Sequence, residues 1–320
     1  MNTSKREELL ARLRDSMAKA GFFVSEPHNI RSISFDVIAR RDKQLLIVKA
    51  LTNIDSLSTD DAEQLRILAN AMGGSPMVIG LHSSSAKLED GILYSRFGIP
   101  IISEATFHEH ILEGVPPFVY AAPGGLYVRL DGELLRKIRQ DRKISLGALA
   151  EIAGVSRKAI QMYESGMGAM IDIAARLEEF LNEPIVVPLD PFSYTKEVAR
   201  TLKSFDEFRG LNRDVFQMLK EIGYSVVPTV RCPFDALARE EDVLLLTGVE
   251  ENPQMTMRKA RVVGNISRVT EKKSVIFVRE QRSVESIEGT PLITEDELRR
   301  ADDTDDVLEL ILKREKRHRK

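Results

Sequence analysis

The side chains best suited to binding a polyanion are concentrated between residues 134 and 168. This stretch contains three acidic residues, Asp141, Glu151 and Glu164, and more than twice as many basic ones. Arg and Lys can donate hydrogen bonds to phosphate and to guanine, and Gln161 can pair with adenine through two hydrogen bonds. The stretch therefore predicts a nucleic-acid-binding surface. Its basic residues are Arg136, Lys137, Arg139, Arg142, Lys143, Arg157 and Lys158.

The chain as a whole does not share this positive charge. Its 320 residues include 46 basic and 49 acidic side chains, which give a net charge of -3. Any affinity for nucleic acid must therefore come from the local patch. A hydrophobic content of 43% with 30% charged residues is ordinary for a globular protein of two domains, or of three small ones.

The spacing of apolar residues around the patch predicts a bundle of short helices. Ser145 and Ser156 are suited to cap the N-termini of two of them, and Gly154 lies in the tight turn between, where a positive φ is easiest for glycine. Gly166 is suited to end the later helix. Two short helices that cross through a glycine turn form a helix-turn-helix. The apolar positions expected to pack the bundle are Leu134, Leu135, Ile138, Leu149, Ala150, Ala153, Ile160, Leu177 and Phe180.

Within this bundle the sequence resembles the Cro and phage-repressor type of helix-turn-helix. The matching residues are Leu149-Ala150, Gly154-Val155-Ser156, Ile160 and Glu164-Ser165-Gly166. The sequence departs from the family at Leu146, where a glutamine often bonds a phosphate. Backbone N–H groups at the same helix end can still bind phosphate.

The resemblance implies that the third helix enters the major groove of DNA. The residues that would then face the bases are Ser156, Arg157, Lys158, Gln161 and Met162. Those that would meet phosphates are Arg136, Lys137, Arg139, Arg142 and Lys143. The alternative is a four-helix module with a solvated basic face and no part in DNA binding.

The segments on either side of the bundle alternate between helical and strand patterns, which predicts an α/β fold for each. Four short segments recur in the same order, for example Phe35–Arg40 with Phe234–Arg239, and predict that the last α/β domain repeats the first. The expected organisation is an α/β domain at 1–113, a hairpin linker at 114–131, the helix-turn-helix at 132–184, a second α/β domain at 193–312 and a basic tail at 313–320.

The first α/β domain resembles the restriction-endonuclease-like fold, and the second, as its repeat, is expected to share it. That fold places a strand Asp before a strand Glu/Asp-x-Lys, and the two acidic residues hold magnesium. Asp36 and Lys49 match this pattern, but Ile47 stands where the second carboxylate belongs. In the repeat, Asp235 is followed by Leu246 and Gly248 at the corresponding positions. Because Mg²⁺ needs oxygen ligands, we expect no catalytic residues, no metal site and no cofactor.

The remaining composition limits the class of protein. A single cysteine, Cys232, excludes an internal disulfide and a cysteine zinc site. No apolar run approaches the roughly 20 residues of a membrane span, and the charged N-terminus lacks an apolar signal core. We therefore expect a cytoplasmic protein without membrane contacts.

The layout as a whole resembles an archaeal family of transcriptional regulators, with a central helix-turn-helix between two α/β domains. The resemblance implies a regulator that binds double-stranded DNA as a homodimer and whose outer domains serve dimerisation or sensing. Two other interpretations stay open. One is a nuclease or repair-associated protein that the helix-turn-helix only targets to DNA, and the other is a protein-interaction scaffold.

Overall fold

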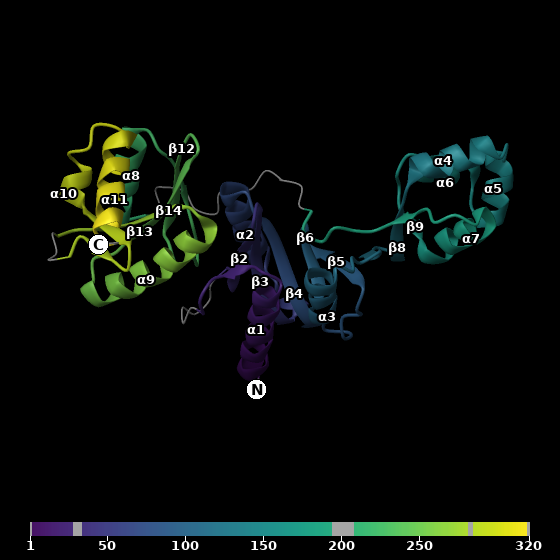
Figure 1. The fold of residues 1–320 in the computed structure, drawn as a ribbon, viewed down its shortest axis with the longest axis horizontal. Helices are drawn as coiled ribbons and strands as arrows, with labels where there is room; N and C mark the ends of the chain where they lie inside the picture. The colour runs from purple at the N-terminus through teal and green to yellow at the C-terminus, as the bar shows by residue number, and fades with distance from the viewer. Residues whose placement is uncertain (1, 28–33, 194–207, 281–283, 319–320) are drawn as a thin grey trace. The chain divides into compact units, whose positions relative to one another are not determined.

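The computed structural model describes residues 2–27, 34–193, 208–280 and 284–318, drawn in Figure 1. The chain folds into two compact units. Unit 1 comprises Met1–Leu9, Leu51–Leu57 and Met77–Tyr194, and unit 2 comprises Leu10–Ala50, Ser58–Pro76 and Thr195–Lys320. Helix α1 (Asn2–Lys19) and strand β3 (Gln44–Asn53) run through the boundaries between the two.

Strands of unit 1 form a sheet in the order β4-β6-β5-β7-β8-β10. Strand β5 pairs antiparallel with β6 and parallel with β7, where Ile92 lies opposite Val119. The predicted hairpin is confirmed as β7 and β8, and its pairing with β5 makes it part of the sheet rather than a free linker. The bounds are β4 Ser75–His82, β5 Ile92–Arg96, β6 Ile99–Ser103, β7 Val119–Ala122, β8 Gly125–Leu130, β9 Ala169–Met170 and β10 Val186–Val187.

Short helices lie around these strands. A 3-10 turn η1 (Ile54–Ser56) follows β3, and α3 (Glu104–His108) continues into a π-helical turn η2 (Glu109–Glu113). The bundle after the hairpin consists of α4 (Gly132–Asp141), α5 (Leu146–Ala153), α6 (Arg157–Glu164) and α7 (Ile171–Leu181). Short β9 and β10 pair with β8 on either side of α7 in the sequence, so the hairpin closes the bundle.

The core of the bundle follows the predicted apolar positions with one exception. Leu135, Leu149, Ile160 and Leu177 are fully buried. Phe180 is 44% exposed, so its predicted place in the core is wrong. Leu181 is fully buried instead, because it lies one helical turn after Leu177 on the same face of α7.

The N-terminal part of unit 2 begins with α1 and an antiparallel run of β1 (Phe23–Val24), β2 (Val37–Arg41) and β3. Helix α2 (Thr59–Met72) follows. The Ser58 hydroxyl accepts a hydrogen bond from the Asp61 amide at the start of α2. Gly73 ends the helix with a φ of 72°, a conformation that costs glycine little.

The C-terminal part of unit 2 contains a sheet in the order β11-β12-β13-β14-β16-β15. Strand β14 runs parallel to β13 and β16, and the other pairs are antiparallel. Phe216, Phe277 and Ile293 lie in its core. The bounds are α8 Leu211–Ile222, β11 Ser225–Pro228, β12 Ala236–Glu240, β13 Val243–Val249, α9 Pro253–Thr270, β14 Lys273–Val278, β15 Ser286–Ile287, β16 Thr290–Thr294, α10 Glu295–Leu298 and α11 Thr304–His318.

The basic end of the chain does not begin as a separate tail at residue 313, as the charge run suggested. Helix α11 continues to His318. Arg314 is buried, donates to the Leu292 carbonyl and pairs with Glu297. These contacts of Arg314 fix the helix against β16 and α10, and only residues 319–320 lie outside the described part. No helix in the described part is long and apolar enough to cross a membrane.

Candidate nucleic-acid interface

Two serine caps and one glycine set the geometry of the helix-turn-helix. The Ser145 hydroxyl accepts from the Ala148 amide at 3.0 Å and begins α5. The Ser156 hydroxyl accepts from the Ala159 amide at 3.1 Å and begins α6. Between them Gly154 ends α5 with a φ of 71°, as its place in the sequence predicted. The turn is therefore short and fixed in direction at both ends.

The predicted base-facing residues share the exposed side of α6 and its N-terminal turn. Ser156, Arg157, Lys158, Gln161 and Met162 are all exposed, whereas Ile160 on the opposite face is fully buried. Met162 is 41% exposed, unusually high for a methionine in a packed module. The structure thus places these five side chains together on one accessible surface.

Arg157 is accommodated by the helix before it. A Cβ atom added at Gly147 on α5 would lie 3.1 Å from the Arg157 guanidinium. The missing side chain therefore leaves the space along which Arg157 extends. Gly147 was not among the residues predicted to have a role. A glycine inside a helix costs about 1 kcal/mol of stability relative to alanine, so its presence in the predicted helix was a signal of close packing at that position.

A buried ion pair locks α6 to α4. The Glu164 side chain is only 3% exposed and accepts hydrogen bonds from Nε and Nη2 of Arg139, the latter at 3.1 Å. Hydrogen bonding to Glu164 raises the pKa of Arg139. Arg136 approaches the same carboxylate at 3.5 Å. Glu164 of the Glu-x-Gly motif therefore has a structural function, because it fixes α6 against α4, the first helix of the bundle.

The ion pair also depends on close backbone approach. A Cβ atom on Gly132 would lie 2.6 Å from the Tyr163 carbonyl oxygen and 2.7 Å from that of Glu164. Only glycine allows the C-terminus of α6 to sit this close to the N-terminus of α4. Asp131 caps α4 by accepting from the Leu134 amide at 2.9 Å. The signal for this helix start is an Asp directly before the apolar spacing.

The predicted phosphate-binding residues fall into two groups. Arg136, Lys137 and Lys143 are exposed. Arg139 is held by Glu164, and Arg142 donates to the Leu181 carbonyl at 2.6 Å and to Glu183 at 3.2 Å. Because Arg136 also lies 3.5 Å from the Glu164 carboxylate, three of the five basic residues have intramolecular partners. Sequence spacing could not show this, because the partners follow 25 to 41 residues later.

The endonuclease-like residues of the N-terminal segment form a second candidate site. Asp36 accepts from the Ala50 amide at 2.8 Å, and Lys49, itself buried, lies 3.9 Å from Asp61. Ile47, where the fold's second carboxylate belongs, is fully buried among apolar side chains. This donor set does not fit Mg²⁺, which prefers several oxygen ligands.

The corresponding residues near Asp235 include a lysine that the sequence analysis missed. Lys259 on α9 places its ammonium 2.8 Å from Asp235 and 3.6 Å from Glu250. Its side chain passes Gly248, where an added Cβ would lie 3.1 Å from the Lys259 Cδ. Gly248 holds the register position of Lys49, so a helix lysine takes the place of a strand lysine. No group of three or more potential metal ligands occurs in the described part of the chain.

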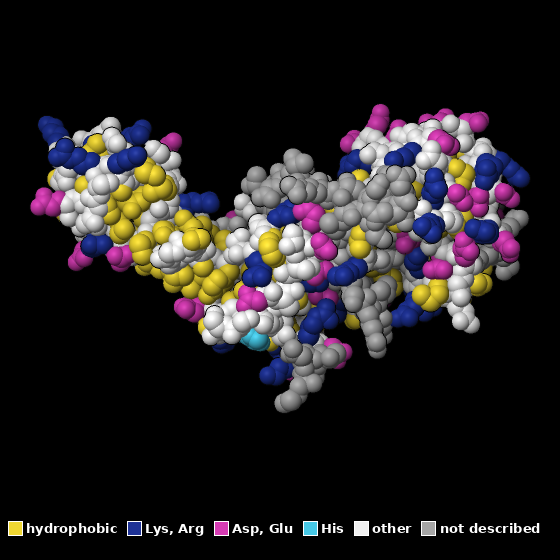
Figure 2. Space-filling model, turned by 180° about the vertical axis from the view of Figure 1, so that it is seen from behind, with side chains coloured by type: hydrophobic (Ala, Val, Ile, Leu, Met, Phe, Trp, Pro, Cys, Tyr) yellow, Lys and Arg dark blue, Asp and Glu magenta, His cyan; other side chains and the backbone are white. Residues whose placement is uncertain are grey.

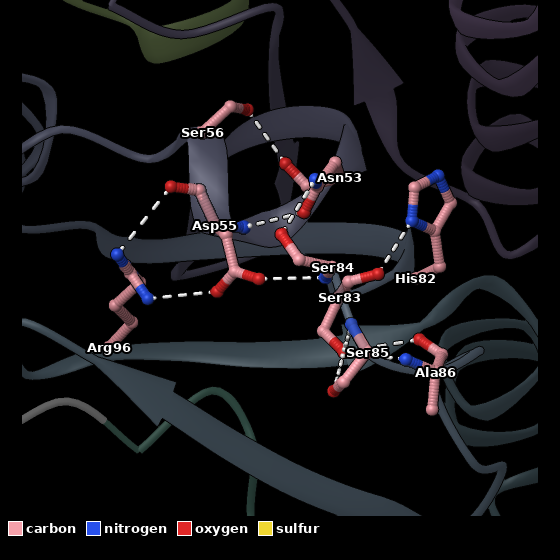
Figure 3. Close-up of polar contacts among 9 residues, drawn as sticks. All are labelled: Asn53, Asp55, Ser56, His82, Ser83, Ser84, Ser85, Ala86 and Arg96. Atoms are coloured by element: carbon pink, nitrogen blue, oxygen red, sulfur yellow. Dashed lines mark hydrogen bonds and ion pairs between the residues drawn. The ribbon is translucent and has the colours of Figure 1, made fainter.

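A third polar cluster, drawn in Figure 3, lies in unit 1 after β3 and β4. Asp55 accepts from the Ser84 amide at 2.7 Å and pairs with Arg96 at 2.9 Å. The Ser84 amide is the main cause that lowers the pKa of Asp55. Asn53 binds the Ser84 hydroxyl at 3.2 Å. These polar groups satisfy one another and order the turn at Ser83–Ala86, which accounts for the cluster structurally.

Comparison with known proteins agrees with both sequence resemblances. Residues 135–187 match a helix-turn-helix family, and residues 6–117 match a PD-(D/E)XK superfamily domain. No solved structure matches the chain.

Proteins similar over nearly the whole length occur in several archaea. A protein of Methanocella arvoryzae is 40% identical, with 97% of both chains covered. Proteins of Halorubrum lacusprofundi and Thermococcus gammatolerans are 38% and 37% identical, with 97% of this chain and 98% of theirs covered. Each is named "Putative HTH-type transcriptional regulatory protein". The chain belongs to this archaeal family of helix-turn-helix transcriptional regulators.

Proposed function

We propose that this regulator recognises a specific sequence in double-stranded DNA by placing α6 in the major groove. The observation that carries the proposal is the row of exposed Arg157, Lys158 and Gln161 on a helix whose opposite face is locked by Ile160 and Glu164. Arg157 and Lys158 would donate to guanine, and Gln161 would pair with adenine. The Ser156 hydroxyl, which already caps α6, would add a contact at the groove edge, and Met162 would meet a thymine methyl group.

Phosphate contacts would position the module on the duplex. Lys137 and Lys143 are exposed, and Arg136, which is exposed too, lies 3.5 Å from Glu164. The backbone at the N-terminus of α5 would supply a further contact beside Leu146, where the repressor family often has glutamine. Arg139 and Arg142 would support this surface indirectly, through their bonds within the bundle.

A homodimer would supply the length of DNA contact that one helix lacks. A single reading helix covers few base pairs, and two-fold symmetric dimers bind two half-sites about one turn of DNA apart. Figure 2 shows hydrophobic side chains gathered on the helix-turn-helix module. Exposed apolar residues there include Met167, Met170 and Ile171. A patch of this kind is a contact surface suited to a second copy.

The outer α/β domains would serve contact or sensing rather than DNA cleavage in a cytoplasmic protein. Ile47 and Leu246, apolar and fully buried, support this assignment. The Lys259 ammonium beside Asp235 also supports it, because a lysine already supplies the positive charge at that carboxylate. The C-terminal sheet order, with a parallel β13-β14-β16 core, supports an endonuclease-like fold for the second domain too. Nuclease action, the alternative, predicts Mg²⁺-dependent cleavage of plasmid DNA by the purified protein.

Selection of binding sites from random duplex DNA tests the proposal. The wild type should enrich one palindromic sequence, and Arg157→Ala and Gln161→Ala should each relax selection at one position per half-site by roughly 5-fold or more. Arg176→Ala is the matched control, because Arg176 is exposed on α7 and pairs with Asp172.

A salt series separates sequence reading from general charge attraction. Nonspecific contacts weaken steeply with salt and ignore sequence. Binding without enrichment, equally affected by all three substitutions, would contradict reading by α6. It would favour a scaffold in which the helix-turn-helix only attaches the protein to DNA.

A further inference from the structure

The strands around Asp36 and Asp235 are related residue by residue. Ile38 lies opposite Ile47 in the β2–β3 pair, and Leu237 lies opposite Leu246 in the β12–β13 pair. Each Asp accepts a hydrogen bond from the backbone amide fourteen positions later, Ala50 in one case and Val249 in the other. Equivalent positions can therefore be assigned in the two α/β segments without ambiguity.

Two equivalent arginines reach across unit 2 in opposite directions. Arg40 on β2 and Arg239 on β12 occupy the same register position. Arg40 donates through Nε to the Val269 carbonyl at 2.8 Å, in the last turn of α9. Arg239 donates to the Ala71 carbonyl, in the last turn of α2. Ala71 lies two residues before Gly73, the C-cap of α2, and Val269 lies two residues before Glu271, the C-cap of α9. The last carbonyls of a helix lack helical partners, and the helix dipole favours a cation there.

Two amide side chains repeat this exchange. Gln64 on α2 accepts from the Val230 amide, just after β11, at 3.0 Å. Asn265 on α9 accepts from the Glu26 amide, just after β1, at 2.8 Å. Gln64 is 1% exposed and Asn265 is 7% exposed, so each is a buried polar group satisfied by the other segment.

We infer that the N-terminal and C-terminal α/β domains of one chain bind each other as an intramolecular pseudo-dimer. In an isologous contact, residue i of one partner meets j of the other while j meets i. The reciprocal Arg40 and Arg239 bonds have this pattern, and the Gln64 and Asn265 bonds likewise run in both directions between the two segments. The partner that fits the β2–α2 face is therefore the β12–α9 face of the same chain.

The pseudo-dimer goes beyond the proposed DNA recognition and does not depend on it. It occupies the surface that each α/β domain would otherwise offer to a second chain. A homodimer of the regulator must then form through another surface. The helix-turn-helix contains none of the reciprocal residues, so loss of DNA reading leaves the inference intact.

A cleavable full-length chain tests the inference. A protease site flanked by Gly-Ser spacers is inserted between residues 200 and 201, and the purified protein is cut and passed over a sizing column. The two pieces of the wild type should elute together. Arg40→Ala with Arg239→Ala should weaken their association at least about tenfold, because both lost bonds come from charged donors.

Arg41→Ala is the matched control. Arg41 neighbours Arg40 but donates to the Ala20 carbonyl and stacks on the Phe22 ring, both within its own segment. Its pieces should stay together. Separation of the wild-type pieces would overturn the inference, and so would an equal effect of the control and the double variant.

A disulfide shows whether the contact lies within one chain. Ser34 lies beside the segment that leads into Cys232, since its hydroxyl donates to the Val230 carbonyl at 3.0 Å and its amide donates to the Arg231 carbonyl at 2.9 Å. Oxidised Ser34→Cys should join the two cut pieces into a product of single-chain mass on a denaturing gel. Ser34→Cys with Cys232→Ser should give none. A product of two-chain mass in the uncut protein would overturn the intramolecular assignment and show exchange between copies.

Discussion

Replacement of Glu164 by glutamine should unfold the helix-turn-helix locally without removing any of the side chains proposed to face DNA. The carboxylate is 3% exposed and bonds the Arg139 guanidinium, which is 15% exposed. Glu164→Gln keeps the size of the side chain and removes its charge. It therefore leaves Arg139 as a largely buried cation without a counter-charge.

The expected cost follows from this burial. Breaking a buried ion pair by removing one partner costs about 3–5 kcal/mol. Arg139 is partly exposed, and the more exposed Arg136 lies beside the same carboxylate. We therefore expect a cost at the lower end of this range, about 3 kcal/mol. For a domain of this size, about 3 kcal/mol lowers the midpoint of thermal unfolding by at least roughly 10 °C.

Native-state hydrogen exchange measures the effect where it occurs. Peptides from 132–187 should lose protection, whereas the C-terminal α/β peptides should keep theirs. Arg139→Gln alone should cost a similar amount. The double variant should cost about 2 kcal/mol less than the sum of the two single changes, because neither buried charge then remains.

Arg157→Ala is the comparison that separates structure from reading. Arg157 is exposed, so its loss should change stability by less than about 0.5 kcal/mol while it relaxes selection at one position per half-site by roughly 5-fold or more. The reasoning fails if Glu164→Gln leaves the protection of 132–187 unchanged. It also fails if the costs of Glu164→Gln and Arg139→Gln simply add.

Three further outcomes are expected. Gly132→Ala should destabilise the bundle by about 1–3 kcal/mol in urea unfolding, since its Cβ meets backbone oxygens that cannot move away without shifting α6. Lys259→Met leaves Asp235 near a second carboxylate, so Mn²⁺ should raise the melting temperature of this variant and leave that of the wild type unchanged. Because the pKa of Asp55 is lowered in the folded state, its stabilisation is fully present above its ordinary pKa of 3.8 and is lost as the pH falls through the lowered value. Asp55→Asn should therefore flatten the acid limb of a pH–stability curve, and an unchanged limb would contradict the contribution of the Ser84 amide.

The sequence by itself determined the local structure of the DNA-binding module. Ser145, Gly154 and Ser156 specify two helix starts and one turn through interactions that span three or four residues. The apolar spacing of α5 and α6 selects the buried face in the same local way. These interactions are short-range, so the residue pattern alone identified the helix-turn-helix and its exposed row.

Tertiary structure decided which charged residues remain available on that surface. Arg139 and Lys143 look alike in the sequence, yet only Arg139 meets a buried carboxylate. Lys259 could not be assigned to Asp235 because the lysine lies on a helix 24 residues later, outside the strand motif that predicted the position.

The same distinction applies to the two α/β domains. Their similarity could be recognised along the chain, because Asp36 and Asp235 precede matching strand pairs. The reciprocal bonds of Arg40 and Arg239 could not, since each acceptor is a backbone carbonyl more than 160 residues away. Backbone carbonyls carry no sequence signature, and only the folded chain determines which helix end an arginine reaches.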